Sequence, residues 1–122
     1  MDTDELKKRT KKFALNILHL IEDLPKNNSG FIIGKQLGRC ATSVGANYRS
    51  ACRAKSKVDF ISKIQIVEEE ADEYCYWLEL IIEGGLIRNN KPILLLKEAN
   101  ELTAIFTATG KTMKERYSKF NK

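Results

Sequence analysis

The chain has 122 residues, with 21 Lys and Arg against 16 Asp and Glu, a net charge of +5 and a pI near 9.1. This length predicts one domain, residues 1–122, and a hydrophobic content of 43% excludes a disordered chain. No apolar run approaches about 18 residues, which excludes a membrane-spanning helix. The three cysteines form no Cys-x-x-Cys pair, which argues against a disulfide framework or a zinc ribbon. The acidic start of the chain is unlike a signal peptide, so we expect a cytoplasmic protein.

The first half of the chain predicts two helices. Apolar side chains recur at helical spacing from residue 4 to about residue 24, where Pro25 and the polar cluster 26–30 predict an end. A second helix is predicted from about residue 31 to residue 53, despite three glycines that each cost roughly 1 kcal/mol against Ala. The side chains expected to face the core are Leu6, Phe13, Ile17, Leu20, Ile21 and Leu24 in the first helix and Ile33, Leu37, Cys40, Val44, Tyr48 and Ala51 in the second.

The second half predicts two more helices. Ser56, followed three residues later by Asp59, resembles a capping box that opens a third helix, which ends at Gly84 and Gly85. Residues 90–92 predict the cap and first turn of a fourth. Four helices joined by short turns predict an all-α fold, an up-down-up-down antiparallel four-helix bundle. The core faces expected here are Phe60, Ile64, Val67, Ala71, Tyr74, Leu78 and Ile82, then Leu95, Leu102, Phe106, Thr109, Met113 and Tyr117.

The charge is distributed unevenly along these helices. Residues 1–58 carry a net charge of +7, residues 59–83 carry −7 and residues 84–122 carry +5. Four basic side chains of the second helix fall within about 40° of one line opposite its core face. We call this set the basic ridge, and it consists of Lys35, Arg39, Arg49 and Arg53.

The basic ridge predicts a non-catalytic adaptor that binds the phosphate backbone of RNA or DNA. Such contacts are salt-sensitive and largely independent of base sequence. A solvated helix face explains the same pattern equally well. The predicted nucleic-acid-binding residues are Lys35, Arg39, Arg49, Arg53, Lys55 and Lys57. A frayed basic arm at the start of the first helix is expected to add Lys7, Lys8, Arg9, Lys11 and Lys12.

The third helix carries more apolar surface than one core face needs. Ile66, Trp77 and Leu80 lie about 120–160° from that face, which predicts an interface between copies of the chain. The acidic run 68–73 lies on the same helix, where like charges one turn apart repel each other. A basic ridge on a neighbouring protomer would neutralise the run. The alternative function is therefore a purely structural or protein-interaction module whose basic and acidic faces pair across protomers.

The sequence gives little support for a catalytic or metal-binding function. The single histidine, His19, is preceded by Asn16 at the position where a di-iron bundle requires Glu. The thiols have no candidate base, and the glycines belong to a helical pattern instead of a phosphate-binding loop. We therefore expect no enzyme activity, no metal site and no cofactor.

A family resemblance covers the second and third helices. It is carried by residues 36–49 (QLGRCATSVGANYR), 53–60 and 66–87 (IVEEEADEYCYWLELIIEGGLI), with matching spacing between them. These segments resemble the four-helix bundle proteins named after the 23S rRNA intervening sequence, which are encoded in insertions of bacterial rRNA genes or elsewhere in bacterial genomes. Where many relatives have Ala-Glu-Gly after the helical asparagine, this chain has Tyr48-Arg49-Ser50, so an acid is replaced by a ridge arginine.

The resemblance also implies an assembly and partners. A related branch, the accessory variability determinant proteins of diversity-generating retroelements, forms barrel-shaped homopentamers that engage a reverse transcriptase and nucleic acid through a basic surface. By this resemblance the chain would be a homopentamer, with RNA or DNA and a reverse transcriptase as possible partners.

Overall fold

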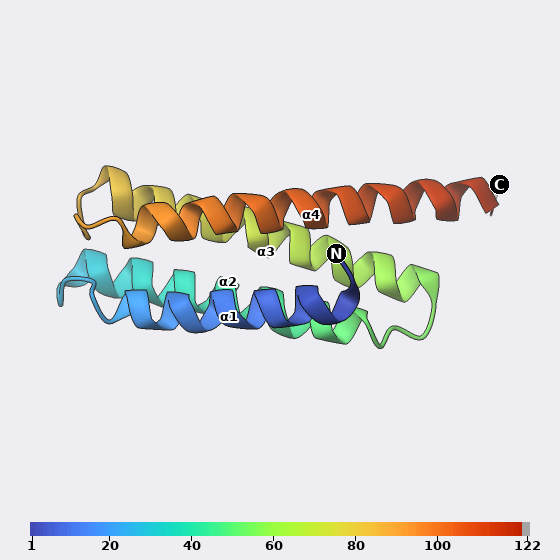
Figure 1. Cartoon of the computed structure of the whole chain (residues 1–122), viewed down its shortest axis with the longest axis horizontal. Helices are drawn as coiled ribbons and strands as arrows, with labels where there is room; N and C mark the ends of the chain where they lie inside the picture. The colour runs from blue at the N-terminus through green and yellow to red at the C-terminus, as the bar shows by residue number, and fades with distance from the viewer. Residues whose placement is uncertain (121–122) are drawn as a thin grey trace.

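The computed structural model describes residues 1–120, which form four helices. These are α1 (Thr3–Ile21), α2 (Asn28–Ala51), α3 (Lys57–Glu83) and α4 (Lys91–Phe120). Successive helices run in opposite directions along one long axis (Figure 1), so the predicted up-down order is confirmed. Since α2 packs against α1 and α3, and α4 packs against α3 and α1, the four helices close around one core. Within residues 1–120 no helix is both long and apolar enough to cross a membrane.

The helix ends differ from the prediction by up to three residues. Asn27 caps α2, because its Oδ1 accepts a hydrogen bond from the Gly30 backbone N–H at 2.9 Å, so the helix begins at Asn28 instead of residue 31. The polar cluster that suggested a turn is thus the first turn of a helix. A Cβ atom at Gly30 would overlap the Pro25 carbonyl oxygen, which explains why glycine stands there.

The predicted start and end of α3 are confirmed. Ser56 Oγ accepts from the Asp59 backbone N–H at 3.0 Å, and Asp59 Oδ2 accepts in return from the Lys55 backbone N–H at 3.3 Å. Gly84 forms the C-terminal cap, and Gly85 adopts φ +64°, a conformation that favours glycine. The fixed α2–α3 turn brings the cations of segment 53–57 beside the end of α2.

The core is built mainly from the predicted faces. Phe13 of α1 contacts Tyr74 of α3 with ring centroids 4.7 Å apart, and Tyr48 of α2 contacts Phe106 of α4 at 5.4 Å. Thr10 is buried although it is polar, because its hydroxyl donates to backbone carbonyls one turn earlier. Several predicted core residues are only partly buried because they lie towards the ends of the bundle: Ile21, Phe60, Ile82, Leu95, Thr109, Met113 and Tyr117.

Candidate functional site

The basic ridge is divided between two depressions on the α1–α2 face. The first has a volume of about 590 Å³ and lies between the end of α1 and the start of α2, where it is lined by Lys35 and Arg39. The second has a volume of about 480 Å³ and lies between the start of α1 and the end of α2, where it is lined by Arg49 and Arg53. Thr42 lines both. The four ridge residues therefore do not form one site.

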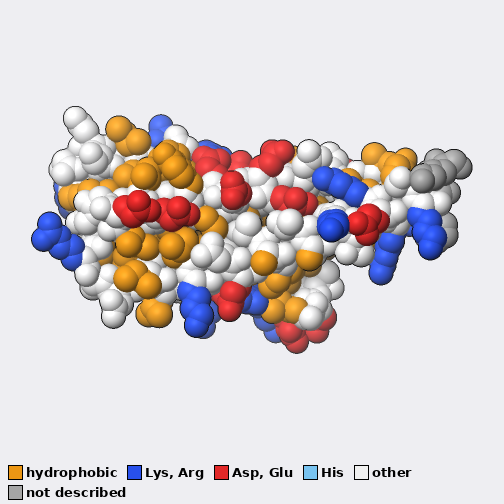
Figure 2. Space-filling view, turned by 90° about the horizontal axis from the view of Figure 1, so that it is seen from above, with side chains coloured by type: hydrophobic (Ala, Val, Ile, Leu, Met, Phe, Trp, Pro, Cys, Tyr) orange, Lys and Arg blue, Asp and Glu red, His pale blue; other side chains and the backbone are white. Residues whose placement is uncertain are grey.

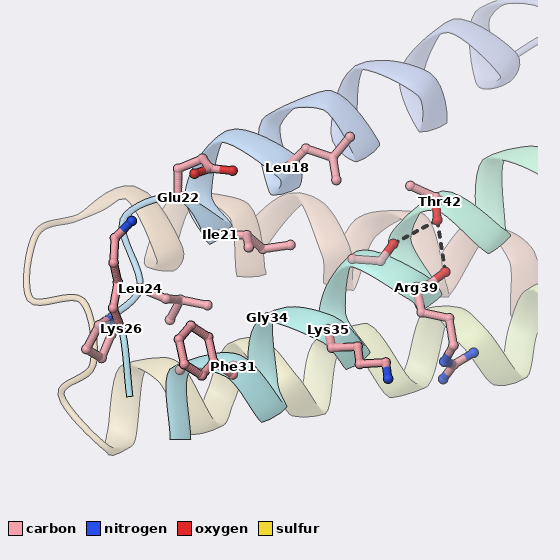
Figure 3. Close-up of a pocket in the computed structure, with 13 residues that line it drawn as sticks. Leu18, Ile21, Glu22, Leu24, Lys26, Phe31, Gly34, Lys35, Arg39 and Thr42 are labelled. Carbon is pink, nitrogen blue, oxygen red and sulfur yellow. Dashed lines mark hydrogen bonds between the residues drawn. The ribbon is translucent and has the colours of Figure 1, made fainter. Parts of the chain in front are cut away.

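The first depression is mainly apolar, and we call it the apolar groove. Leu18, Ile21 and Leu24 line one side and Phe31 lines the other (Figure 3). Gly34 on its floor lets the two helices approach closely, since a Cβ atom there would lie 3.2 Å from side-chain atoms of Ile21 and Leu24. Lys35 and Arg39 project from the α2 side of this groove, and Glu22 and Lys26 line it as well.

Arg39 is already paired within the chain. Its Nη1 donates to Glu70 Oε2 at 2.9 Å, and its Nη2 donates to Glu73 Oε1 at 2.6 Å. Burial disfavours the charged form of Glu73, but hydrogen bonds from Arg39 and Trp77 outweigh it, so the pKa of this carboxyl is lowered. The compensation expected from a neighbouring protomer is thus provided at Glu70 and Glu73 by the same chain.

The second depression is lined by cations on both sides. Lys7, Lys8 and Lys11 come from α1, while Arg49 comes from the last turn of α2 and Arg53 from the turn that follows it. Among the described residues, none of these five cations forms an ion pair. The remaining lining residues are small and uncharged, namely Thr10, Ala14, Thr42, Gly45 and Ala46.

A shallower depression of about 400 Å³ continues this surface towards α3. It shares Ala46, Arg49 and Arg53 with the second depression and adds Lys55. The acid that lines it, Asp59, is neutralised, since Lys63 Nζ donates to its Oδ1 at 2.7 Å and holds the pKa of that carboxyl below its usual value. We call the combined surface the basic groove. Apart from Lys63, which is paired with Asp59, its cations are Lys7, Lys8, Lys11, Arg49, Arg53 and Lys55.

The start of α1 is a regular helix and not the frayed arm that the sequence suggested. Asp2 Oδ1 accepts from the Glu5 backbone N–H at 2.8 Å and caps it. Arg9 faces α4, where its Nη2 lies 2.6 Å from Glu98 Oε1 and 2.7 Å from Glu101 Oε2. Successive helical residues point about 100° apart, which is why Lys8 lines the groove while Arg9 does not.

The comparisons with known proteins agree with this fold. The family model described as 23S rRNA-intervening sequence protein matches residues 3–108, a span that includes both grooves. The chain belongs to this family. A crystal structure from Bacteroides thetaiotaomicron, described as a protein with unknown function from the S23 ribosomal protein family, is 33% identical with a TM-score of 0.81. The similarity covers 91% of this chain and 99% of that one. The search of curated proteins gave no match.

In this member of the family, the predicted site residues lie in three different surroundings. Arg49, Arg53 and Lys55 lie together in the basic groove. Lys35 and Arg39 lie at the apolar groove instead, and Lys57 is exposed at the first position of α3. The α1 lysines belong to the groove because α1 packs antiparallel to α2, a relation that helix periodicity within one segment does not reveal.

The three residues of the predicted interface also differ in exposure. Ile66 is 41% exposed, whereas Trp77 and Leu80 are partly buried against the core of their own chain. Trp77 Nε1 donates to Glu73 Oε1 at 3.2 Å, which ties the indole to the Arg39 cluster. Other large apolar side chains are exposed as well, including Phe31 at 63% and Ile32 at 61%. Figure 2 shows apolar side chains gathered near the end of the bundle that holds the α3–α4 turn, with acidic side chains among them.

The buried cysteines of this chain behave as core residues. Burial raises the pKa of the Cys40 thiol to about 12, so this cysteine stays protonated at neutral pH. Burial likewise raises the pKa of Cys75, whose sulfur lies 3.4 Å from Thr103 Oγ1. Within residues 1–120, no three His, Cys, Asp or Glu side chains are grouped so that they could hold a metal ion.

Proposed function

We propose that this chain is a nucleic-acid-binding adaptor that holds the phosphate backbone of RNA or DNA in the basic groove. The observation that carries the proposal is the gathering of six cations from two helices and a turn on one surface, which consists of two adjoining depressions. The acid that lines it, Asp59, is already paired with Lys63. Neutralising phosphates in this way releases counterions and gives affinity without reading base sequence.

Arg49 and Arg53 are the central residues of the proposed contact. Arg49 lies in the last turn of α2, and Arg53 lies in the turn just beyond the Cys52 cap, so that both line the two depressions of the groove. Each guanidinium can donate two parallel hydrogen bonds to one phosphate, which an ammonium group cannot do. The small side chains of Gly45 and Ala46 leave the space beside them open to a backbone.

Arg39 is removed from the proposed contact by its own partners. Its guanidinium donors point at Glu70 and Glu73, and these two carboxylates would repel a phosphate brought near. Lys35 lies at the rim of the apolar groove, separated from the six cations of the basic groove. The proposal thus narrows the six predicted binding residues to Arg49, Arg53 and Lys55, and it keeps Lys7, Lys8 and Lys11 of the predicted basic arm.

We also propose that the adaptor is a homo-oligomer, a homopentamer as the family resemblance implies, with a reverse transcriptase as its protein partner. The exposed apolar side chains support association, because monomers rarely leave many large apolar groups in water. The alternative is a structural module in which the basic groove binds acidic side chains of a neighbouring copy. It is favoured by Glu69 and Asp72, which are exposed and form no ion pair with the described residues.

Fluorescence anisotropy with short labelled RNA and DNA separates these candidates. The double variant Arg49→Ala/Arg53→Ala is compared with Lys97→Ala/Lys111→Ala, which removes the same charge from exposed positions of α4 outside both grooves. The adaptor proposal expects the groove variant to bind about tenfold more weakly, and the control to match the wild type. If the groove variant keeps its affinity but loses its oligomeric mass, the arginines serve assembly and the structural module is correct.

A further inference from the structure

We propose that the basic groove selects double-stranded over single-stranded nucleic acid, an inference that rests on the proposed function. The ligand class is the paired phosphate backbone, whether of DNA or of RNA. Three features of the groove support this choice: its lining side chains, the hydrogen bonds that those side chains already make, and the rigid placement of its cations.

The described residues that line the groove include no aromatic side chain. Proteins that bind single strands without sequence preference combine a basic channel with aromatic rings on which unpaired bases stack. Among the residues whose exposure is described, the most exposed aromatic side chains lie elsewhere, since Phe31 lines the apolar groove and Tyr76 lies against Trp77 on α3. An unpaired strand in the basic groove would therefore meet charges but no stacking platform.

The two threonine hydroxyls of the groove are already engaged in hydrogen bonds. Thr10 Oγ1 donates to the Leu6 and Lys7 carbonyls, and Thr42 Oγ1 donates to the Gly38 carbonyl at 2.8 Å. No Asn or Gln side chain is among the described lining residues, and the Ser50 hydroxyl is the one neutral side-chain group there without a hydrogen bond. The groove therefore meets its ligand mainly through cations, which suit backbone phosphates.

The cations form two rows on packed parts of the fold. Lys7, Lys8 and Lys11 lie on α1, and Arg49 lies in the last turn of the antiparallel α2, with the two helices at a typical axial distance of about 8–10 Å. Arg53 lies in the turn after α2, where its backbone N–H donates to the Ser50 carbonyl at 3.0 Å. A duplex presents its phosphates in a fixed array with one charge per about 1.7 Å, which is twice the density of a single strand. A flexible strand must first be ordered to match fixed cations, and that ordering weakens its binding.

Ala46 offers a direct probe of this surface. It is exposed, and it lines both depressions that make up the groove. Ala46→Glu places a negative charge in the groove three residues before Arg49 without removing any cation, whereas Ala46→Gln adds the same bulk without charge. Because both residues are good helix formers, the pair isolates charge from volume and from helix stability.

The test measures the affinity of the full chain for four labelled probes of equal length at one salt concentration: duplex DNA, duplex RNA and the matching single strands. We expect at least one duplex to bind about tenfold more tightly than its own single strands, with this preference lost in Ala46→Glu and kept in Ala46→Gln. Single strands that bind as tightly as their duplex would overturn the selectivity while leaving the adaptor function intact. If none of the four probes binds at low salt, the proposed function itself is wrong.

Discussion

Arg39 of α2 reaches across to Glu73 of α3, and its Nη2 donates a hydrogen bond to Glu73 Oε1 at 2.6 Å. The other guanidinium nitrogen, Nη1, donates a hydrogen bond to Glu70 Oε2. One arginine thus links two acids of the run 68–73 that would otherwise repel each other. Trp77 donates to the same Glu73 oxygen. The arginine that is central to the predicted ridge therefore stabilises the α2–α3 contact.

Replacing Arg39 by Ala is expected to lower the thermal midpoint of unfolding while leaving nucleic-acid affinity nearly unchanged. The loss should be larger at low salt, because Arg39 and its partners are partly exposed and salt screens them. Thermal denaturation followed by circular dichroism at low and high salt measures the change. Lys35→Ala is the matched control, since Lys35 is exposed one turn earlier and forms no ion pair with the described residues. Equal midpoints for the two variants would contradict this role.

The Arg9–Glu98 pair predicts a loss of stability in acid. The hydrogen bond from Arg9 lowers the pKa of the Glu98 carboxyl below its ordinary value of 4.5. A lowered pKa in the folded state means that the contribution is complete above 4.5 and disappears as the pH falls through the folded value. Urea denaturation at a series of pH values should show this decline, and Arg9→Gln should make it shallower. An unchanged pH profile in Arg9→Gln would show that the pair is not responsible.

Tyr74→Phe is expected to leave the free energy of unfolding unchanged or to raise it by up to about 1 kcal/mol. The Tyr74 ring is fully buried, and its hydroxyl lies near Thr103 but makes no hydrogen bond of good geometry with the described residues. Phe13→Ala, which removes the ring packed against Tyr74, should instead cost about 3–5 kcal/mol. Chemical denaturation measures both, and a clear destabilisation by Tyr74→Phe would reveal a hydrogen bond at the hydroxyl.

Two glycines of α2 should respond to alanine in opposite ways. A Cβ atom at Gly45 would lie 3.8 Å from Thr10, an ordinary contact, so Gly45→Ala should stabilise the helix by about 0.5–1 kcal/mol. A Cβ atom at Gly30 would overlap the Pro25 carbonyl, which belongs to the backbone and cannot rotate away, so Gly30→Ala should destabilise by about 1–3 kcal/mol. Denaturation midpoints of the two variants test the prediction, which fails if both change in the same direction.

Ile66→Asp is expected to reduce the mass of the oligomer while keeping its helicity. Ile66 is the most exposed of the three predicted interface residues, so a charge there should disturb association more than folding. Trp77→Glu would also disturb folding, because Trp77 packs against the core and donates a hydrogen bond to Glu73. Light scattering gives the mass and circular dichroism gives the helicity. If the wild-type chain is a monomer in solution, the predicted interface does not exist.

Local patterns predicted the helices well and the site only in part. Periodicity identified core residues such as Phe13 and Tyr48, because a helix face depends on spacing alone. The Asn27 cap was missed, since caps and turns favour the same residue types. Two features of the site depend on which helices are neighbours: the pairing of Arg39 with acids of α3, and the depression that the α1 lysines share with Arg49. That information lies in the tertiary packing and not in any one segment.

The salt dependence of duplex binding tests the central proposal most directly. Six groove cations predict that log K falls against log salt concentration with a slope of about −5, because each neutralised phosphate contributes about −0.9. Arg49→Ala/Arg53→Ala should reduce that slope by about two. A slope near zero, or one that the double variant leaves unchanged, would contradict phosphate binding in the basic groove.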